Sequence, residues 1–197
     1  MANASGPDEA WKGFLDDLVA RKLGAPLLCV IDGNAGLRRA VQLVWPKAAV
    51  QRCAVHKLRN MQGKAPKHAQ EEIADDFHQI VYASDGKAAE LAREAFRRKW
   101  EKACPGVVRS LDEGGDELLT FYAFPKQQWK TIRTTNVIER LNGEFRRRVK
   151  TQGSLPTEDS ALVLLFSLVA SGQIKLRKLD GFEKIAALLN ATARRAA

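Results

Sequence analysis

Apolar positions along the chain follow two patterns, helical spacing and short continuous runs. Residues 8–23 carry apolar side chains three or four positions apart, which predicts an amphipathic helix that ends before Gly24 and Pro26. A short apolar run, a helical pattern ended by Pro46 and a second short run follow, at 27–32, 35–45 and 48–55. This order predicts a right-handed βαβ unit with a parallel strand pair. It places Asp32 at the carboxyl end of the first strand, where α/β sheets hold their chemistry.

Helical spacing dominates the remainder. From about His56 to Trp129 no strand is convincing, and turn signals occur at residues 84–86, 104–106 and 113–115. Pro156 and Thr157 offer a start signal for a largely apolar helix, and a final helix is expected beyond Gly181, ending loosely at 192–197. The sequence therefore predicts an α/β, mostly helical chain. We divide it into a first part of an α/β domain, an all-helical insertion and a set of C-terminal helices, at residues 1–60, 61–128 and 129–197.

Composition narrows the partners and the compartment. The formal charge of +9 and the pI near 9.7 favour a polyanionic partner, most often nucleic acid, although a merely solvated basic face is an open alternative. Three cysteines are too few for a disulfide framework, which favours a reducing cytoplasm. The longest apolar run, 161–170, is about half of the ~20 residues of a membrane-spanning helix, and the first residues lack a signal-peptide pattern. We expect a soluble cytoplasmic protein with no membrane partner.

The segment TTNVIERLNGEFRRRVK, residues 134–150, places one acid on an otherwise basic helix. Wound as a helix, it has an apolar stripe that should dock on the core, made of Ile138, Leu141, Phe145 and Val149. Two interpretations of Glu139 are open and compatible. Asn136 as N-cap with Glu139 three residues on is typical of a capping box. Alternatively, Glu139 is a metal ligand beside phosphate groups held by the arginines, an arrangement that phosphoryl transfer requires.

Two long blocks carry a family resemblance. VIDGNAGLRRAVQLVWPKAAVQRCAVHKLRN at 30–60 and FYAFPKQQWKTIRTTNVIERLNGEFRRRVKTQGSLPTEDSAL at 121–162 resemble the catalytic half of the Mutator-like transposases of bacterial insertion sequences. The resemblance implies a partial ribonuclease-H-like fold, a DDE active site with Mg²⁺ or Mn²⁺, and double-stranded DNA as the substrate that is cut and joined. In this family pattern Asp32 matches the second catalytic aspartate and Glu139 matches the glutamate.

The resemblance extends to Cys53 and His56, a C-x-x-H pair after the second strand. Half a zinc site needs two more ligands with recognisable spacing, so no zinc is expected. Instead, we expect Cys53 in the core and His56 near the metal site. DNA contacts are expected from Arg52, His56, Lys57, Arg59, Asn136, Arg140, Asn142, Arg146, Arg147 and Arg148, with a solvated basic face as the alternative for any of the residues near the second strand.

The sequence departs from the family pattern at the first catalytic aspartate. The aspartates before Asp32, which are Asp8, Asp16 and Asp17, fall in the first helix, where none suits a strand-borne ligand. We expect a truncated transposase with little catalysis of its own. The alternatives are a non-catalytic DNA-binding or regulatory fragment that interferes with full-length transposase, and an unrelated basic helical module. An unpaired sheet edge should favour a homo-oligomer or pairing with a full-length transposase.

Overall fold

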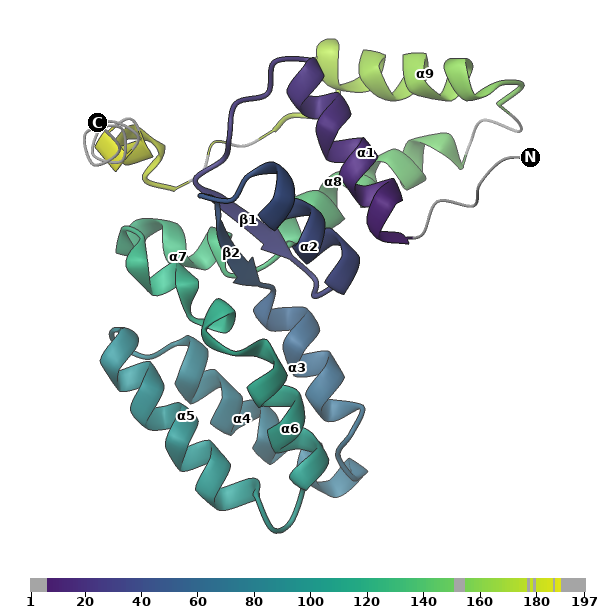
Figure 1. The fold of residues 1–197 in the computed structure, drawn as a ribbon. Coiled ribbons are helices and arrows are strands. Elements are labelled where there is room, and N and C mark those ends of the chain that lie inside the picture. The colour runs from purple at the N-terminus through teal and green to yellow at the C-terminus, as the bar shows by residue number, and fades with distance from the viewer. Residues whose placement is uncertain (1–6, 151–154, 177, 179, 186, 189–197) are drawn as a thin grey trace.

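The computed structural model describes residues 7–150, 155–176, 178, 180–185, 187 and 188, and the chain is mostly helical with one small sheet (Figure 1). The sheet consists of β1 (Leu28–Ile31) and β2 (Ala49–Arg52). The α-helices are α1 (Pro7–Ala20), α2 (Ala35–Val44), α3 (Ala54–Gln62), α4 (Gln70–Val81), α5 (Gly86–Trp100), α6 (Pro105–Gly114), α7 (Trp129–Ile132), α8 (Asn136–Val149) and α9 (Glu158–Ala170). Short 3-10 helices are η1 (Lys67–Ala69), η2 (Asp116–Leu118), η3 (Thr120–Ala123), η4 (Lys126–Gln128) and η5 (Phe182–Lys184). No helix in this part of the chain is both long and apolar enough to cross a membrane.

The two strands pair in parallel and are joined by α2, which confirms the predicted strand, helix and strand order. One face of the sheet packs against α1 and α2 around a small buried cluster that includes Leu15, Ile31, Val41, Trp45 and Val50. The strands are shorter than the apolar runs, because α3 already begins at Ala54, within the predicted second strand. We call α1, β1, α2 and β2 together the sheet unit.

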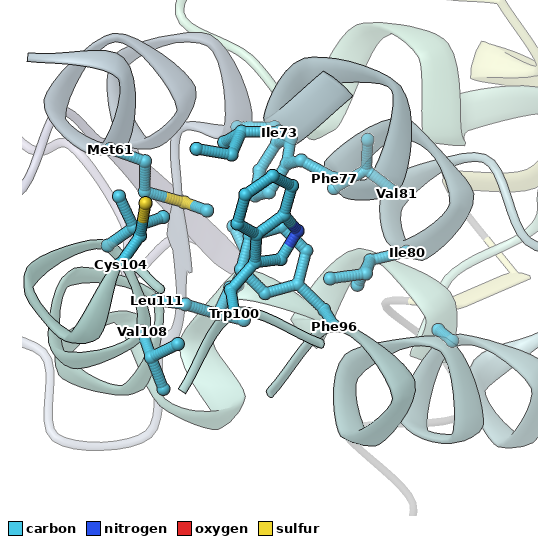
Figure 2. Packing of buried hydrophobic residues seen from close by; sticks show 14 of the residues in the cluster. Met61, Ile73, Phe77, Ile80, Val81, Phe96, Trp100, Cys104, Val108 and Leu111 are labelled. Carbon is cyan, nitrogen blue, oxygen red and sulfur yellow. The ribbon is translucent and has the colours of Figure 1, made fainter. Parts of the chain in front are cut away.

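Helices α3 to α6 pack around one buried core, and we call these four helices the insertion. No strand occurs between residues 53 and 128, all of which are described. Figure 2 shows Trp100 of α5 among apolar side chains from the neighbouring helices, including Phe77 and Ile73 of α4 and Leu111 of α6. The indole nitrogen of Trp100 donates a hydrogen bond to Asp76 Oδ2 at 2.8 Å, so this buried ring keeps its polar group satisfied. In Figure 1 the insertion lies at the opposite end of the sheet from α1 and α9.

The three predicted turns coincide with helix boundaries. Asp85 caps α5 by accepting the Ala88 amide, and Pro105 occupies the first turn of α6. Gly115 follows α6 with a φ of 52°, in the left-handed region that glycine adopts without strain. These local signals set where the helices of the insertion start and stop.

Helices α8 and α9 are packed more loosely than the prediction implied. The apolar stripe of α8 docks only in part, because no residue of α8 is fully buried and Ile138 is 51% exposed. The predicted start of α9 is confirmed: Thr157 accepts the Ser160 amide in a capping box. Phe166 of α9 is nevertheless 73% exposed. After Gly181 the chain forms η5, and the predicted loose end at 192–197 lies outside the described residues.

The two edges of the sheet differ. Thr120 donates to the Val50 carbonyl at 2.7 Å, so the η2–η3 segment covers the outer edge of β2. The amide of Ala49 donates to Leu27 O and the amide of Cys53 donates to Ile31 O. The backbone N–H and C=O groups of the alternate residues of β1, Leu28 and Val30, therefore point away from β2. No strand in the described part of the chain pairs with that side of β1. The predicted open edge is therefore present on β1 and covered on β2.

Candidate active site

Asp32 leaves β1 at its carboxyl end, as predicted, and enters a tight turn. One carboxylate oxygen of Asp32 accepts the Asn34 amide at 3.0 Å, an Asx turn, and Asn34 in turn caps α2 by accepting the Leu37 amide at 2.9 Å. The carboxylate of Asp32 is exposed. The turn thus presents an acid to solvent while its neighbour starts the next helix.

Gly33 is required in this turn for two reasons. Its φ of 103° is one that residues with a side chain rarely adopt, and a Cβ built at this position would lie 1.5 Å from Cζ of Arg52. The guanidinium group of Arg52 therefore lies directly against the backbone of the turn that holds Asp32.

Cys53 connects the ends of the two strands. It is fully buried, as predicted, and its amide donates to Ile31 O at 2.7 Å, directly before Asp32. Its Sγ lies 3.3 Å from Nδ1 of His56, one turn along α3. The C-x-x-H pair thus forms a local hydrogen-bonding unit at the carboxyl edge of the sheet.

Glu139 reaches this edge from α8 through Thr135. The hydroxyl of Thr135 donates to Glu139 Oε1 at 2.7 Å, and the Thr135 amide donates to Cys53 Sγ at 3.3 Å. Nδ1 of His56 lies 3.6 Å from Glu139 Oε1. Residues 82 positions apart in the chain are therefore joined, and Glu139 is linked through Thr135 and Cys53 to Ile31, which directly precedes Asp32.

The predicted capping box of α8 is wrong. Thr135, not Asn136, occupies the N-cap position, and its side chain makes no cap hydrogen bond to the helix backbone. A capping side chain must accept from a helix amide, for which the N-cap residue is typically extended, whereas Thr135 has φ −88° and ψ 11°. Its hydroxyl instead donates to the Glu139 carboxylate. Glu139 is therefore bound through its side chain to the site, and its place near the helix start does not by itself account for its position.

Two predicted DNA contacts, Arg52 and Lys57, lie inside the protein. Lys57 is fully buried, and its ammonium group donates to Ser110 O and to Glu113 Oε2, each at 2.7 Å. Arg52 is buried beside it, 3.5 Å from Glu113 Oε1. Burial removes both side chains from any surface that DNA touches, so their predicted phosphate contacts do not fit this structure.

The titration of the Lys57–Glu113 ion pair reflects its surroundings. Burial lowers the pKa of Lys57, although the hydrogen bond with Glu113 opposes the shift. The same hydrogen bond from Lys57 holds the pKa of Glu113 below its ordinary value. The ion pair joins α3 to α6 within the insertion, so it holds the helix that carries His56 against α6.

The remaining predicted DNA contacts divide into two groups. Exposed side chains belong to Arg59, Asn136, Arg140, Asn142 and Arg146, and His56 is partly exposed. Arg147 donates to Glu144 Oε2 at 2.8 Å, and Arg148 contacts the same carboxylate while donating to Gln173 O. These two arginines hold the pKa of Glu144 below its usual value. The positive charge at the end of α8 is thus partly neutralised, while Arg140 and Arg146 are exposed.

The donor atoms suit a hard divalent cation but do not complete a site. Carboxylate oxygens are the ligands that Mg²⁺ and Mn²⁺ prefer, and Asp32 and Glu139 supply them from an exposed and a 40% exposed side chain. Among the described residues, no group of three or more histidine, cysteine, aspartate or glutamate side chains is arranged to hold a metal ion. These two acids therefore fit part of a metal site.

Thr135 was not predicted from the sequence. A signal was present, since Thr135 and Glu139 are four positions apart at a helix start, a spacing that brings side chains together. The contact with Cys53 had no such signal, because it depends on how α8 docks against the sheet unit. Only the fold brings these side chains together.

Comparison with known proteins places these residues in a family. The family model described as "Transposase, Mutator family" matches residues 1–176. The chain is 36% identical over 152 residues to the transposase for insertion sequence element IS1201 of Lactobacillus helveticus, covering 77% of this chain and 41% of that protein. It is 35% identical over 165 residues to the transposase for insertion sequence element IST2 of Acidithiobacillus ferrooxidans, covering 83% and 56%.

A third relative, the transposase for insertion sequence element IS1081 of Mycobacterium tuberculosis, is 34% identical over 160 residues, or 81% of this chain and 39% of the relative. The chain therefore spans about half the length, or less, of the curated relatives it matches. The similarity covers both strands and the segment that carries Glu139.

Proposed function

Because the chain belongs to the Mutator family of transposases, we propose that Asp32 and Glu139 are two acids of a DDE-type site that cuts and joins DNA with Mg²⁺ or Mn²⁺. The observation that carries this proposal is the hydrogen-bonded path from Ile31 through Cys53 and Thr135 to Glu139. It ties an acid on α8 to the end of the strand that presents Asp32. Such a convergence at the carboxyl edge of a parallel sheet is typical of an active site.

Each of these residues has a separate task in the proposed reaction. Bound divalent metal would polarise the phosphodiester group and favour attack by water or a DNA hydroxyl. Asp32 and Glu139 would hold the metal with carboxylate oxygens, and the guanidinium group of Arg52 would keep the Asp32 turn in place. Arg140 and Arg146, exposed on the same helix as Glu139, would hold the DNA backbone near the site.

We propose further that the sheet is part of a larger, ribonuclease-H-like sheet. Three features support this: the open side of β1, a groove of about 500 Å³ alongside it, and the greater length of the relatives. Apolar side chains of β1 and α8 line this groove, among them Leu28, Val30, Val137, Ile138 and Leu141. An apolar strand from another part of a transposase polypeptide would cover both the groove and the edge. A second copy or a full-length transposase is the partner we propose.

A second function has its own supporting observation. No third acid joins Asp32 and Glu139 among the described residues, while Arg140, Arg146 and Arg59 are exposed. DNA binding needs exposed cations and no metal, so this chain alone would bind DNA without cutting it and would interfere with full-length transposase. The two functions differ in whether activity requires the carboxylates of Asp32 and Glu139.

A plasmid-nicking assay separates these functions. Supercoiled DNA is incubated with the chain and Mn²⁺ or Mg²⁺, and conversion to the open circle is measured for the unaltered chain, Asp32→Ala and Glu139→Ala. Metal-dependent nicking that both substitutions abolish supports the catalytic proposal. DNA binding without nicking, unchanged in both variants, supports the binding function. Nicking that survives both substitutions contradicts the assigned roles of these acids.

Salt-dependent DNA binding tests the surface of α8. The affinity for a fluorescent duplex should fall steeply with salt, because binding to phosphates releases counterions. Arg146→Ala should weaken binding similarly for all sequences and reduce the slope of log affinity against log salt by about 1. Arg98→Ala, which removes an exposed arginine from α5, is the matched control and should leave the slope unchanged. Equal effects of the two substitutions would remove α8 from the interface.

A further inference from the structure

Thr135 lies at the centre of the site and contacts three of its side chains. Its hydroxyl is 2.7 Å from Glu139 Oε1, 3.3 Å from Cys53 Sγ and 3.4 Å from His56 Nδ1. Its amide makes a separate hydrogen bond to Cys53 Sγ at 3.3 Å. No other residue in the described part of the chain is recorded in hydrogen bonds with all three of these side chains.

The chemistry of these groups decides where the hydroxyl proton goes. An ionised carboxylate can only accept, and 2.7 Å is the shortest of the three contacts, so the single proton of Thr135 is donated to Glu139. The lone pairs of the same oxygen then face Cys53 and His56, and either side chain can donate a hydrogen bond to that oxygen. Thr135 thus connects a buried thiol and an imidazole to the acid.

The anchoring of Thr135 is firm, while that of Glu139 without it is weak. Cys53, which receives the Thr135 amide, is fully buried and bonded through its own amide to Ile31. The backbone two residues before Thr135 is also bonded to α3, because the Ala54 amide donates to Arg133 O at 2.9 Å. By contrast, α8 has no buried residue, and Glu139 is a flexible side chain that is 40% exposed. The other polar contact of this carboxylate in the described part of the chain is longer, since His56 Nδ1 lies 3.6 Å from Oε1.

We infer that Thr135 is a positioning residue for Glu139. Its hydroxyl holds Oε1 at the carboxyl edge of the sheet, which leaves the other oxygen for a cation that Asp32 shares. The part of this inference that concerns the cation rests on the proposed function. The hold on the carboxylate does not, and it can be tested by itself.

Two substitutions isolate the hydroxyl. Thr135→Val keeps the branched shape and removes the donor, whereas Thr135→Ser keeps the donor and removes a methyl group. Thr134→Val is the matched control, because it makes the same change one residue earlier, where the hydroxyl lies 3.5 Å from the Asn136 amide. If Thr135→Val does not fold, as judged by circular dichroism, Thr135→Ala removes the same hydroxyl without a branched side chain.

Two readouts are needed, Mn²⁺ affinity and the position of the carboxylate. Mn²⁺ binding to each purified chain is measured by water-proton relaxation, and crystal structures of Thr135→Val and Thr135→Ser are compared with that of the unaltered chain. We expect about ten-fold weaker Mn²⁺ binding in Thr135→Val, near-normal binding in Thr135→Ser and in Thr134→Val, and a displaced Glu139 carboxylate only in Thr135→Val.

The outcomes distinguish the inference from the proposed function. A Glu139 carboxylate that stays in place in Thr135→Val overturns the positioning role. A loss in Thr135→Ser as large as that in Thr135→Val overturns it too, since the hydroxyl would not be what matters. If the unaltered chain binds no Mn²⁺ while the carboxylate moves only in Thr135→Val, the positioning role is supported and the metal role of this chain fails.

Discussion

The helical insertion and the sheet unit differ in how fully they bury apolar side chains and pair backbone groups within themselves. The insertion encloses a core of aromatic and aliphatic side chains from four helices, with Phe77 and Trp100 buried in it (Figure 2). The sheet unit has a smaller cluster on one face of the sheet, an open edge on β1 and a groove toward α8. A region that satisfies its own packing can serve as a support, whereas a region with open backbone groups needs another polypeptide to complete it.

The site lies on the less complete of the two regions. Asp32 ends β1, and Glu139 comes from α8, which buries no residue of its own. Both are linked to the insertion indirectly, since α3 begins at the end of β2 and carries His56 on one side and the buried Lys57 on another. The insertion therefore supports the site from the side of β2, while the side of β1 is left without a pairing strand among the described residues.

The largest expected effect comes from the core of the insertion. Phe77→Ala removes a ring that is 1% exposed, and the lost burial plus the cavity should lower the free energy of unfolding by about 3–5 kcal/mol. Urea unfolding followed by circular dichroism measures it. Leu91→Ala in the same insertion, where the side chain is 69% exposed, should change it by less than about 0.5 kcal/mol. Equal losses would show that the insertion is not the well-packed region described.

A smaller effect is expected at the turn of the sheet unit. Gly33→Ala introduces a Cβ against Arg52 and forces a φ of 103° on alanine, so the strain should cost about 1–3 kcal/mol and displace the Asp32 turn. Thermal unfolding measures the loss. Gly13→Ala provides the control, because that glycine lies within α1 with nothing within 4 Å of its Cβ position, and the change should stabilise by about 0.5–1 kcal/mol. A neutral Gly33→Ala would contradict the close contact with Arg52.

The smallest effect concerns the ion pair that joins α3 to α6. The pKa of Glu113 is held below its ordinary value by Lys57, so its contribution to stability is complete above the unfolded pKa of about 4.3 and is lost as pH falls through the folded pKa. Because Glu113 is 56% exposed, the contribution should be at most about 1 kcal/mol.

Glu113→Gln should therefore lose stability near pH 7 and depend less on pH below about 4.3 than the unaltered chain does. Urea midpoints at pH 7 and pH 3 measure the difference. Glu94→Gln, an exposed change elsewhere in the insertion, should follow the unaltered chain at both pH values. A Glu113→Gln profile parallel to the unaltered one would show that the hydrogen bond from Lys57 does not stabilise the fold.

Local chemistry was enough to predict the order of elements and several boundaries. The strand, helix and strand order, the turns at 84–86 and 113–115 and the start of α9 at Thr157 were all indicated by side chains and backbone within each segment. Hydrogen bonds between near neighbours form in the same way in many contexts, so their sequence signals are dependable.

Only the tertiary structure shows which charged side chains are buried and where in the fold the Glu139 carboxylate is held. Lysine is usually exposed, and Lys57 can be buried because Ser110 and Glu113, more than 50 positions away, accept hydrogen bonds from its ammonium group. The cap expected at Asn136 is absent, and Glu139 instead accepts from Thr135 four positions earlier. This hydrogen bond is local, and the contact of Thr135 with Cys53 places it at the edge of the sheet. The sequence by itself determined the order of the elements and marked Asp32 and Glu139 as candidates. Contacts between distant segments determined which charged side chains are buried, because those energies exist only once the helices have packed.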